Sequence, residues 1–255
     1  MKRITMKLKN YKNPIGKIPF HIGDRFIYYH NGIYYLTGTT DQNEGFRLFS
    51  SKDFLDWDFS GWALKKDEKS KGISHFWAPE VIFYNNKFYL TYSSLHKEEG
   101  RFLISLAVSD NPYGPFVDLY SPWFDFGFAA IDGHIFVDDD ERVYLYFSRN
   151  GHDNIKNIDY GIIYGVELEK DLSKPISEPV LLLEASQNWE MIRDDNRCNE
   201  GPTVIKHNGK YYMTYSANHT CYHGYAVGYA VANSPLGEWI KAEENPILED
   251  RKSVV

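Results

Sequence analysis

The sequence predicts an all-β protein with the β-propeller fold, and the main observation behind this prediction is an internal repeat. One pattern recurs at residues 28–39, 83–94, 137–148 and 206–217: apolar residues, a short polar turn and then an aromatic-rich strand. When the repeats are aligned on Leu36, Leu90, Leu145 and Met213, successive copies are separated by comparable lengths of chain, and the last interval is the longest. Such spacing is typical of propeller blades, which must pack against their neighbours because each is too small to bury its own faces.

Each repeat contains two strand pairs. The first is a hairpin, because Asn31-Gly32 and Asn208-Gly209 favour a type I′ turn, in which both central residues have positive φ. A second pair follows at residues 45–59, 101–116, 160–172 and 225–239. The sequence therefore predicts one domain over residues 1–255, with four-stranded antiparallel blades at about 16–65, 72–125, 126–185 and 190–243. No long stretch has the 3.6-residue period of a helix, and a β-sandwich would not produce a long-range repeat.

The composition excludes several classes of protein. The 255 residues include 28 Lys and Arg against 35 Asp and Glu, a formal charge of −7, with no basic block. Because nucleic-acid affinity depends largely on neutralising phosphates, no nucleic-acid partner is expected. No apolar run approaches the ~20 residues that cross a bilayer, so no membrane partner is expected either. The first residues lack the apolar core of a signal peptide, which predicts a cytoplasmic protein unless a leader was removed.

The cysteines and glycines give no sign of a cofactor. Cys198 and Cys221 lack metal-ligand spacing, and no Gly-rich phosphate loop follows a strand. We therefore assign no zinc and no nucleotide, and expect chemistry that requires no cofactor.

Three carboxylates occur near the start of the first strand of a repeat. Asp132 and Glu200 precede the aligned residue of their repeats by the same interval, and Asp24 lies one position closer to its own. A propeller arranges equivalent positions of its blades in a ring, so these side chains should converge at one end of the channel. Any one of them could cap a turn or bind a structural cation, but the shared position favours a common site. Two carboxylates that flank a bond can serve as acid and base in glycoside hydrolysis, and a third can raise the pKa of the acid by charge repulsion.

Trp77 occupies the corresponding place in the second repeat, since it precedes Leu90 by the same interval as Asp132 and Glu200 precede their aligned residues. We interpret it as a wall of a sugar-binding pocket. The alternative is a core tryptophan wedged between two blades.

At these residues the chain resembles glycoside hydrolase family 43, five-bladed β-propeller enzymes that act on xylose- and arabinose-containing glycans. The resemblance rests on GDRFIYYHNGIYYLTGT, HFWAPEVIFYNNKFYLTYS, AIDGHIFVDDDERVYLYFS and EGPTVIKHNGKYYMTYSAN, in this order along nearly the whole chain. It implies a five-bladed propeller whose fifth blade is incomplete in this chain, with residues 244–255 as its beginning. The chain departs from the family at Asp24-Arg25, where Asp is usually followed by Pro.

The resemblance also implies roles for individual residues. Asp24 matches the general base, Glu200 matches the general acid, and Asp132 matches the residue that orients the acid and raises its pKa. Further residues are expected to contact the sugar: Trp77, Phe76, His21, His75, His134 and Arg197. A structural calcium or sodium ion in the channel is compatible with the resemblance, but no residue is assigned to it.

The predicted function is inverting hydrolysis of xylose- or arabinose-containing oligosaccharides from their ends, of the β-xylosidase or α-L-arabinofuranosidase type. Two alternatives stay open: a carbohydrate-binding propeller without activity, and another five-bladed sugar enzyme such as a glycoside phosphorylase. Three acids in register favour hydrolysis, because binding alone does not require two separated carboxylates. Neither the choice between the two sugars nor the oligomeric state is predicted.

Overall fold

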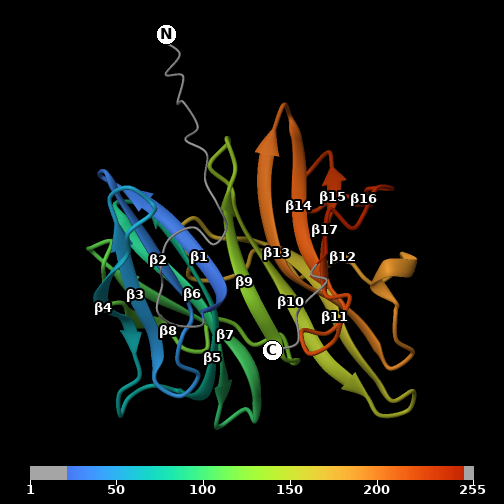
Figure 1. Cartoon of the computed structure of the whole chain (residues 1–255), viewed down its shortest axis with the longest axis horizontal. Coiled ribbons are helices and arrows are strands. Elements are labelled where there is room, and N and C mark those ends of the chain that lie inside the picture. Colours follow the sequence, from blue (N-terminus) through green and yellow to red (C-terminus); the bar gives the residue numbers. More distant parts are fainter. Residues whose placement is uncertain (1–21, 250–255) are drawn as a thin grey trace.

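The computed structural model describes residues 22–249, which form β-strands and connecting loops with a single short 3₁₀ turn, η1 (Asn188–Glu190) (Figure 1). The first sheet consists of β1 (Gly23–His30), β2 (Ile33–Thr39), β3 (Gly45–Ser51) and β4 (Asp58–Lys65). The second consists of β5 (Gly72–Tyr84), β6 (Lys87–His96), β7 (Arg101–Ser109) and β8 (Val117–Tyr120). Both sheets are antiparallel and follow the order of the chain.

The third and fourth repeats form one nine-stranded sheet. The third repeat supplies β9 (Ala130–Val137), β10 (Val143–Asp153), β11 (Ile158–Leu168) and β12 (Val180–Leu183). The fourth supplies β13 (Asn196–His207), β14 (Lys210–Ala217), β15 (Ala226–Ala232), β16 (Ile240–Lys241) and β17 (Leu248–Glu249). The two halves are joined where β11 and β13 run parallel over residues 159–161 and 196–198.

The first strand of each repeat lies on the inner side of the molecule, since β1 contacts β5, β5 contacts β9, and β9 contacts β13. Within residues 22–249, β13 does not pack against β1 in the same way, so closure of a ring is not seen there. The prediction of an all-β protein with four-stranded antiparallel sheets is confirmed. No helix in the described part of the chain is long and apolar enough to span a membrane.

Residues 244–255 were expected to begin a fifth blade. Of these, Leu248 and Glu249 form β17, which pairs with β15 at Val227 and Ala226 and so extends the fourth repeat. Residues 250–255 lie outside the described residues.

The hairpin turns have the geometry that their sequences favour. Asn31 and Gly32 have φ values of 48° and 85°, and Asn208 and Gly209 have 50° and 75°, as a type I′ turn requires. The third hairpin is longer, because Val137 pairs with Val143 across residues 138–142.

Each first strand carries a β-bulge at the same level. In every bulge one residue has a left-handed backbone: Asp24 (φ 44°), Ala78 (45°), Asp132 (59°) and Gly201 (63°). In a bulge, two residues of one strand lie opposite a single residue of the partner strand. This changes the direction of the side chains, so that residues which would otherwise point to opposite faces can face the same site. Strained backbone of this kind in non-glycine residues is concentrated at functional sites.

The positions of the bulges show that the alignment of the three acids, which was based on their spacing in the sequence, was partly wrong. Asp24 and Asp132 are structurally equivalent, whereas Glu200 precedes its bulge by one residue, in the place that Trp77 has in β5. The longer third turn adds one residue between Asp132 and its aligned Leu145. Asp132 and Glu200 are therefore equally far from their aligned residues in the sequence but do not occupy equivalent positions in the strands.

Aromatic side chains dominate the core between the sheets. Phe46, Phe76 and Tyr92 are fully buried between the first and second sheets, with the Phe46 and Tyr92 ring centroids 5.5 Å apart. Tyr146 and Tyr215 are equally buried in the cluster shared by the third and fourth repeats. Burial of such large rings is a major source of stability, so most of the aromatic content serves packing.

Candidate active site

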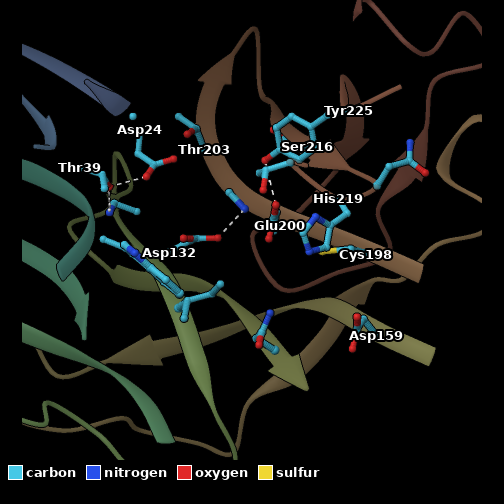
Figure 2. A pocket seen from close by; sticks show the side chains of 18 of the residues that line it. Asp24, Thr39, Asp132, Asp159, Cys198, Glu200, Thr203, Ser216, His219 and Tyr225 are labelled. Carbon is cyan, nitrogen blue, oxygen red and sulfur yellow. Dashed lines mark hydrogen bonds between the residues drawn. The ribbon is translucent and has the colours of Figure 1, made fainter. Parts of the chain in front are cut away.

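A cavity of about 970 Å³ lies at the level of the four bulges. Figure 2 shows Asp24, Asp132 and Glu200 beside it, and they come from the first strands β1, β9 and β13. The structure thus brings together three acids that belong to three different repeats and lie far apart in the chain.

Asp24 is exposed to the cavity and held by one side chain of its own sheet. The Thr39 hydroxyl on β2 donates a hydrogen bond to Asp24 Oδ2 at 2.5 Å (Figure 2). The same hydroxyl accepts a hydrogen bond from the N–H of Ala78 at 3.0 Å. Thr39 therefore links Asp24 to the bulge of the second sheet, next to Trp77.

Asp132 is bound by groups from three strands. Its Oδ2 accepts hydrogen bonds from the N–H of Gly201 at 3.0 Å and from the Ser148 hydroxyl at 3.3 Å. Its own N–H donates to Ser93 Oγ at 3.0 Å. These contacts fix the carboxylate beside Glu200, the residue that precedes Gly201.

Glu200 faces the cavity from the opposite side to Asp24 in Figure 2. Its Oε1 accepts a hydrogen bond from the Tyr225 hydroxyl at 2.9 Å. The thiol of Cys198 also lies within hydrogen-bonding reach of the Glu200 carboxyl group. Burial raises the pKa of that thiol, so Cys198 is a neutral donor and not a thiolate.

The environment favours a proton on the Asp132 and Glu200 pair. Burial raises the pKa of Asp132 well above its usual range, and the negative charges of Glu200 and Asp24 raise it further. Burial also raises the pKa of Glu200, although the hydrogen bonds from Tyr225 and Cys198 partly offset the effect. Because the two carboxyl groups interact, they titrate as a pair and can retain a proton where an isolated carboxyl group has lost its own. The site can therefore supply a general acid.

Trp77 lines the same cavity, and its ring packs against a second aromatic side chain. Its ring stacks on Phe102 with centroids 4.6 Å apart and an interplanar angle of 24°. A tryptophan held in this way offers a rigid apolar face to a bound ring.

Two residues predicted to contact the sugar lie instead in the interior. Phe76 is fully buried and stacks on Tyr92. Neighbouring residues of a strand point to opposite faces, so Phe76 points into the core while Trp77 points into the cavity. His134 is 9% exposed, with Nδ1 2.7 Å from Glu80 Oε2 and Nε2 accepting the Val204 N–H at 3.1 Å. Both ring nitrogens are thus satisfied within the protein.

Two further residues predicted to contact the sugar, His75 and Arg197, are not among the described residues that line the cavity. His75 lies behind Trp77, with ring centroids 5.2 Å apart, and its Nδ1 is 2.8 Å from the Ser74 hydroxyl. The Arg197 guanidinium donates to the backbone carbonyls of Arg193 and Asn196. His21 lies outside the described residues.

Sequence reasoning missed the polar wall beyond Glu200. It consists of residues from β10, β11, β13 and the loop after β14, namely Asn150, His152, Asp159, Asn196, Asn218, His219 and Thr220. His152 Nδ1 lies 2.6 Å from Asp159 Oδ1. Asn150 and Asn218 do share a position in the repeat, five residues after Leu145 and Met213, but the first two repeats have other residue types there, so the alignment did not mark them. The pairing of β11 with β13 brings the third and fourth repeats together at this wall.

No group of three or more His, Cys, Asp or Glu side chains within residues 22–249 is arranged to hold a metal ion. The three acids of the cavity accept hydrogen bonds from hydroxyl and N–H donors, an arrangement that suits proton transfer.

Comparison with known proteins gives consistent results. The chain matches the family model described as glycosyl hydrolases family 43 over residues 11–254. It is 25% identical over 245 residues to a xylosidase/arabinosidase of Bacteroides ovatus, covering 85% of this chain and 73% of that protein. It is 30% identical over 188 residues to xylosidase/arabinosidase 43A of Humicola insolens, covering 64% of this chain and 57% of that protein.

Solved structures share the fold. A thermostable family-43 glycoside hydrolase is 45% identical, with a TM-score of 0.89, over 95% of this chain and 78% of the other. An endo-1,4-β-xylanase from Bacteroides thetaiotaomicron is 38% identical, with a TM-score of 0.77, over 89% of this chain and 74% of the other. Since the family match extends over nearly the whole sequence, the chain belongs to glycoside hydrolase family 43.

Proposed function

We propose that this glycoside hydrolase cleaves xylose- or arabinose-containing oligosaccharides with inversion, using Glu200 as general acid and Asp24 as general base. The observation that carries the proposal is the placement of these two carboxylates on different sheets around one cavity, with Asp132 bound between them. The choice of sugar is supported by the activity in the names of the Bacteroides ovatus and Humicola insolens relatives.

In the proposed reaction Glu200 gives its proton to the glycosidic oxygen as the bond from that oxygen to the anomeric carbon breaks. Asp24 takes a proton from a water molecule, whose oxygen bonds to the anomeric carbon from the opposite face. The products are a sugar of inverted configuration and the shortened oligosaccharide. Asp132 holds Gly201, and through it the backbone of Glu200. Because the two carboxyl groups titrate as a pair, the proton that they retain is the one that Glu200 gives to the leaving oxygen.

The direct test is hydrolysis of an aryl β-xyloside and an aryl α-L-arabinofuranoside by the purified protein. We expect turnover of at least one of them. Turnover of neither, by a protein whose circular dichroism and melting curve indicate folding, would contradict the proposal.

We further propose that the enzyme acts on chain ends. The cavity, at about 970 Å³, is at the upper end of the range of about 300–1,000 Å³ for small-molecule sites, which suits a short oligosaccharide. With linear xylo- and arabino-oligosaccharides as substrates, the monosaccharide should be the first product at every chain length. Early appearance of internal fragments would instead indicate endo-action, the activity named for the Bacteroides thetaiotaomicron structure.

Tyr225→Phe should change the pH dependence in a defined direction. The Tyr225 hydroxyl donates to Glu200 Oε1, which stabilises the ionised carboxylate and lowers its pKa. Without that donor the pKa of Glu200 should rise, so the acid stays protonated to higher pH. The basic limb of the kcat/KM profile should therefore move to higher pH, whereas an unchanged limb, or one at lower pH, would contradict this role. Tyr29→Phe is the control, because Tyr29 is exposed and does not line the cavity.

A further inference from the structure

A hydroxyl side chain occupies the same position on the second strand of every repeat. It lies three residues after the aligned Leu or Met, giving Thr39, Ser93, Ser148 and Ser216. Each is paired across the sheet with the residue just before or at the edge of the bulge: Gly23, Trp77, Ile131 and Glu200. The repeat thus places a hydroxyl beside every bulge.

Three of these hydroxyls bind the bulge of the following repeat. Each accepts a hydrogen bond from the N–H of the residue with left-handed backbone: Ala78 to Thr39 at 3.0 Å, Asp132 to Ser93 at 3.0 Å, and Gly201 to Ser148 at 3.2 Å. The partners in each bond belong to different repeats, so the contacts join separate parts of the chain.

Two of the hydroxyls also act as donors within their own sheet. Thr39 donates to Asp24 Oδ2 at 2.5 Å, and Ser148 donates to Asp132 Oδ2 at 3.3 Å. A hydroxyl can donate once and accept as well, so each of these side chains connects an N–H of the next repeat to a carboxylate of its own repeat. In the second sheet the bulge carries no carboxylate, and Ser93 binds only the N–H of Asp132.

Water is not available to replace these contacts at two of the three positions, because Ser93 and Ser148 are fully buried. Ser94 provides an internal comparison. It is equally buried, and its hydroxyl has no hydrogen-bond partner among the described residues. A buried hydroxyl on β6 therefore does not always find a hydrogen-bond partner, and the bond that Ser93 accepts from the Asp132 N–H depends on the position of Ser93 beside the bulge.

We infer that Thr39, Ser93 and Ser148 are positioning residues. Each joins its own repeat to the next one, and together they hold the catalytic carboxylates in their relative positions. Ser93 positions Asp132 from the second sheet, Ser148 positions Glu200 by holding Gly201, and Thr39 joins Asp24 to the sugar-facing segment at Trp77. The inference rests on the proposed roles of Asp24 and Glu200. It assigns to these three hydroxyls the alignment of catalytic groups that come from different repeats.

The inference predicts a one-to-one pattern in backbone amide exchange measured by NMR. Ser93→Ala should accelerate exchange at Asp132 by about tenfold or more, because that amide loses a fully buried acceptor. Thr39→Val should accelerate exchange at Ala78 and Ser148→Ala at Gly201 by smaller factors, because Thr39 is only partly buried and the Gly201 N–H keeps its bond to Asp132 Oδ2. Ser94→Ala should accelerate exchange at none of them. Exchange that does not change, or that rises equally at all three amides, would overturn the inference.

The same variants should lose activity without losing substrate binding. We expect kcat on an aryl glycoside to fall about 10- to 100-fold in Thr39→Val, Ser93→Ala and Ser148→Ala, with little change in KM, as for a small displacement of reacting groups. Thr39→Ser, which keeps the hydroxyl, should restore most of kcat, and Ser94→Ala should match the wild type. If the variants show the expected amide exchange but keep the kcat of the wild type, the positioning role is wrong.

The two measurements separate this inference from the proposed function. If the wild type hydrolyses the substrate and the Asp24 and Glu200 variants do not, the function stands and the hydroxyl variants decide the inference. If the wild type is inactive, the proposed function fails and the positioning role fails with it, while the exchange pattern still decides whether the hydroxyls hold the bulges.

Discussion

A Glu200→Gln variant should lose about 10²- to 10⁴-fold in kcat on oligosaccharides, the usual contribution of a general acid, and much less on aryl glycosides with a good leaving group. The reason is that a nitrophenolate is stable enough to leave as an anion, whereas the oxygen of a leaving sugar must be protonated as the bond breaks. Parallel assays of one xylo-oligosaccharide and one dinitrophenyl xyloside, or their arabinose counterparts, measure the difference.

Asp24→Asn should reduce kcat by a similar factor on both kinds of substrate, because the attacking water needs a base whatever group departs. Asp140→Asn is the control: Asp140 accepts a hydrogen bond from the Arg142 side chain in the third hairpin turn and does not line the cavity, so its change should leave kcat unaltered. Equal losses in Glu200→Gln on the two substrates, or an active Asp24→Asn, would contradict the assigned roles.

The largest effect on stability is expected from Lys241→Met. Lys241 on β16 donates to both carboxylate oxygens of the fully buried Glu190, at 2.6 and 2.7 Å, and to Asn199 Oδ1 at 3.1 Å. Without the ammonium group, Glu190 would be a buried charge lacking its cation, which costs roughly 3–5 kcal/mol of unfolding free energy. Denaturant-induced unfolding at neutral pH measures the loss.

The control for this change is Lys170→Met, which removes an ion pair with Glu141 in which both side chains are exposed. Solvent and salt screen such a pair, so the unfolding midpoint should hardly move. A Lys241→Met protein as stable as Lys170→Met would contradict the structural importance of the buried pair.

The buried pair also predicts a pH dependence. Burial by itself would raise the pKa of Glu190, but the hydrogen bonds from the Gln187 N–H, Lys241 and the Ser186 N–H outweigh it and lower the pKa. A carboxyl group with a lowered pKa stabilises the folded state above its unfolded pKa, and this stability is lost as the pH falls through the folded value. Wild type and Lys241→Met should therefore approach each other in stability as the solution is acidified below that value.

The sequence predicted those features that follow from local chemistry or from the repeat. Asn-Gly turns require positive φ, so the hairpins could be located from two residues each, and the repeat then placed Asp24, Asp132 and Glu200 at one end of the inner strands. It could not predict the bulges, because a bulge depends on how two strands pair. Spacing therefore aligned Asp132 with Glu200, when Asp132 is equivalent to Asp24.

The side chains around the acids were harder to predict for the same reason. Phe76 and Trp77 are adjacent aromatic residues, and only the course of β5 decides that one enters the core and the other the cavity. His134 is close to Asp132 in sequence, yet it turns to Glu80 and the Val204 N–H. The repeated hydroxyl at Thr39, Ser93 and Ser148 was present in the pattern, but Thr and Ser are ordinary strand residues, and nothing in the local sequence marks them as contacts to the next repeat.

The stereochemistry of hydrolysis tests the central claim most directly. Proton NMR of the anomeric signals in the first minutes of the reaction, before mutarotation, identifies the sugar as it leaves the enzyme. If Asp24 activates water while Glu200 protonates the leaving group, the sugar must first appear with the anomeric configuration opposite to that of the substrate. A first product with the configuration retained would mean that a carboxylate attacks the sugar itself, and would contradict the roles assigned to Asp24 and Glu200.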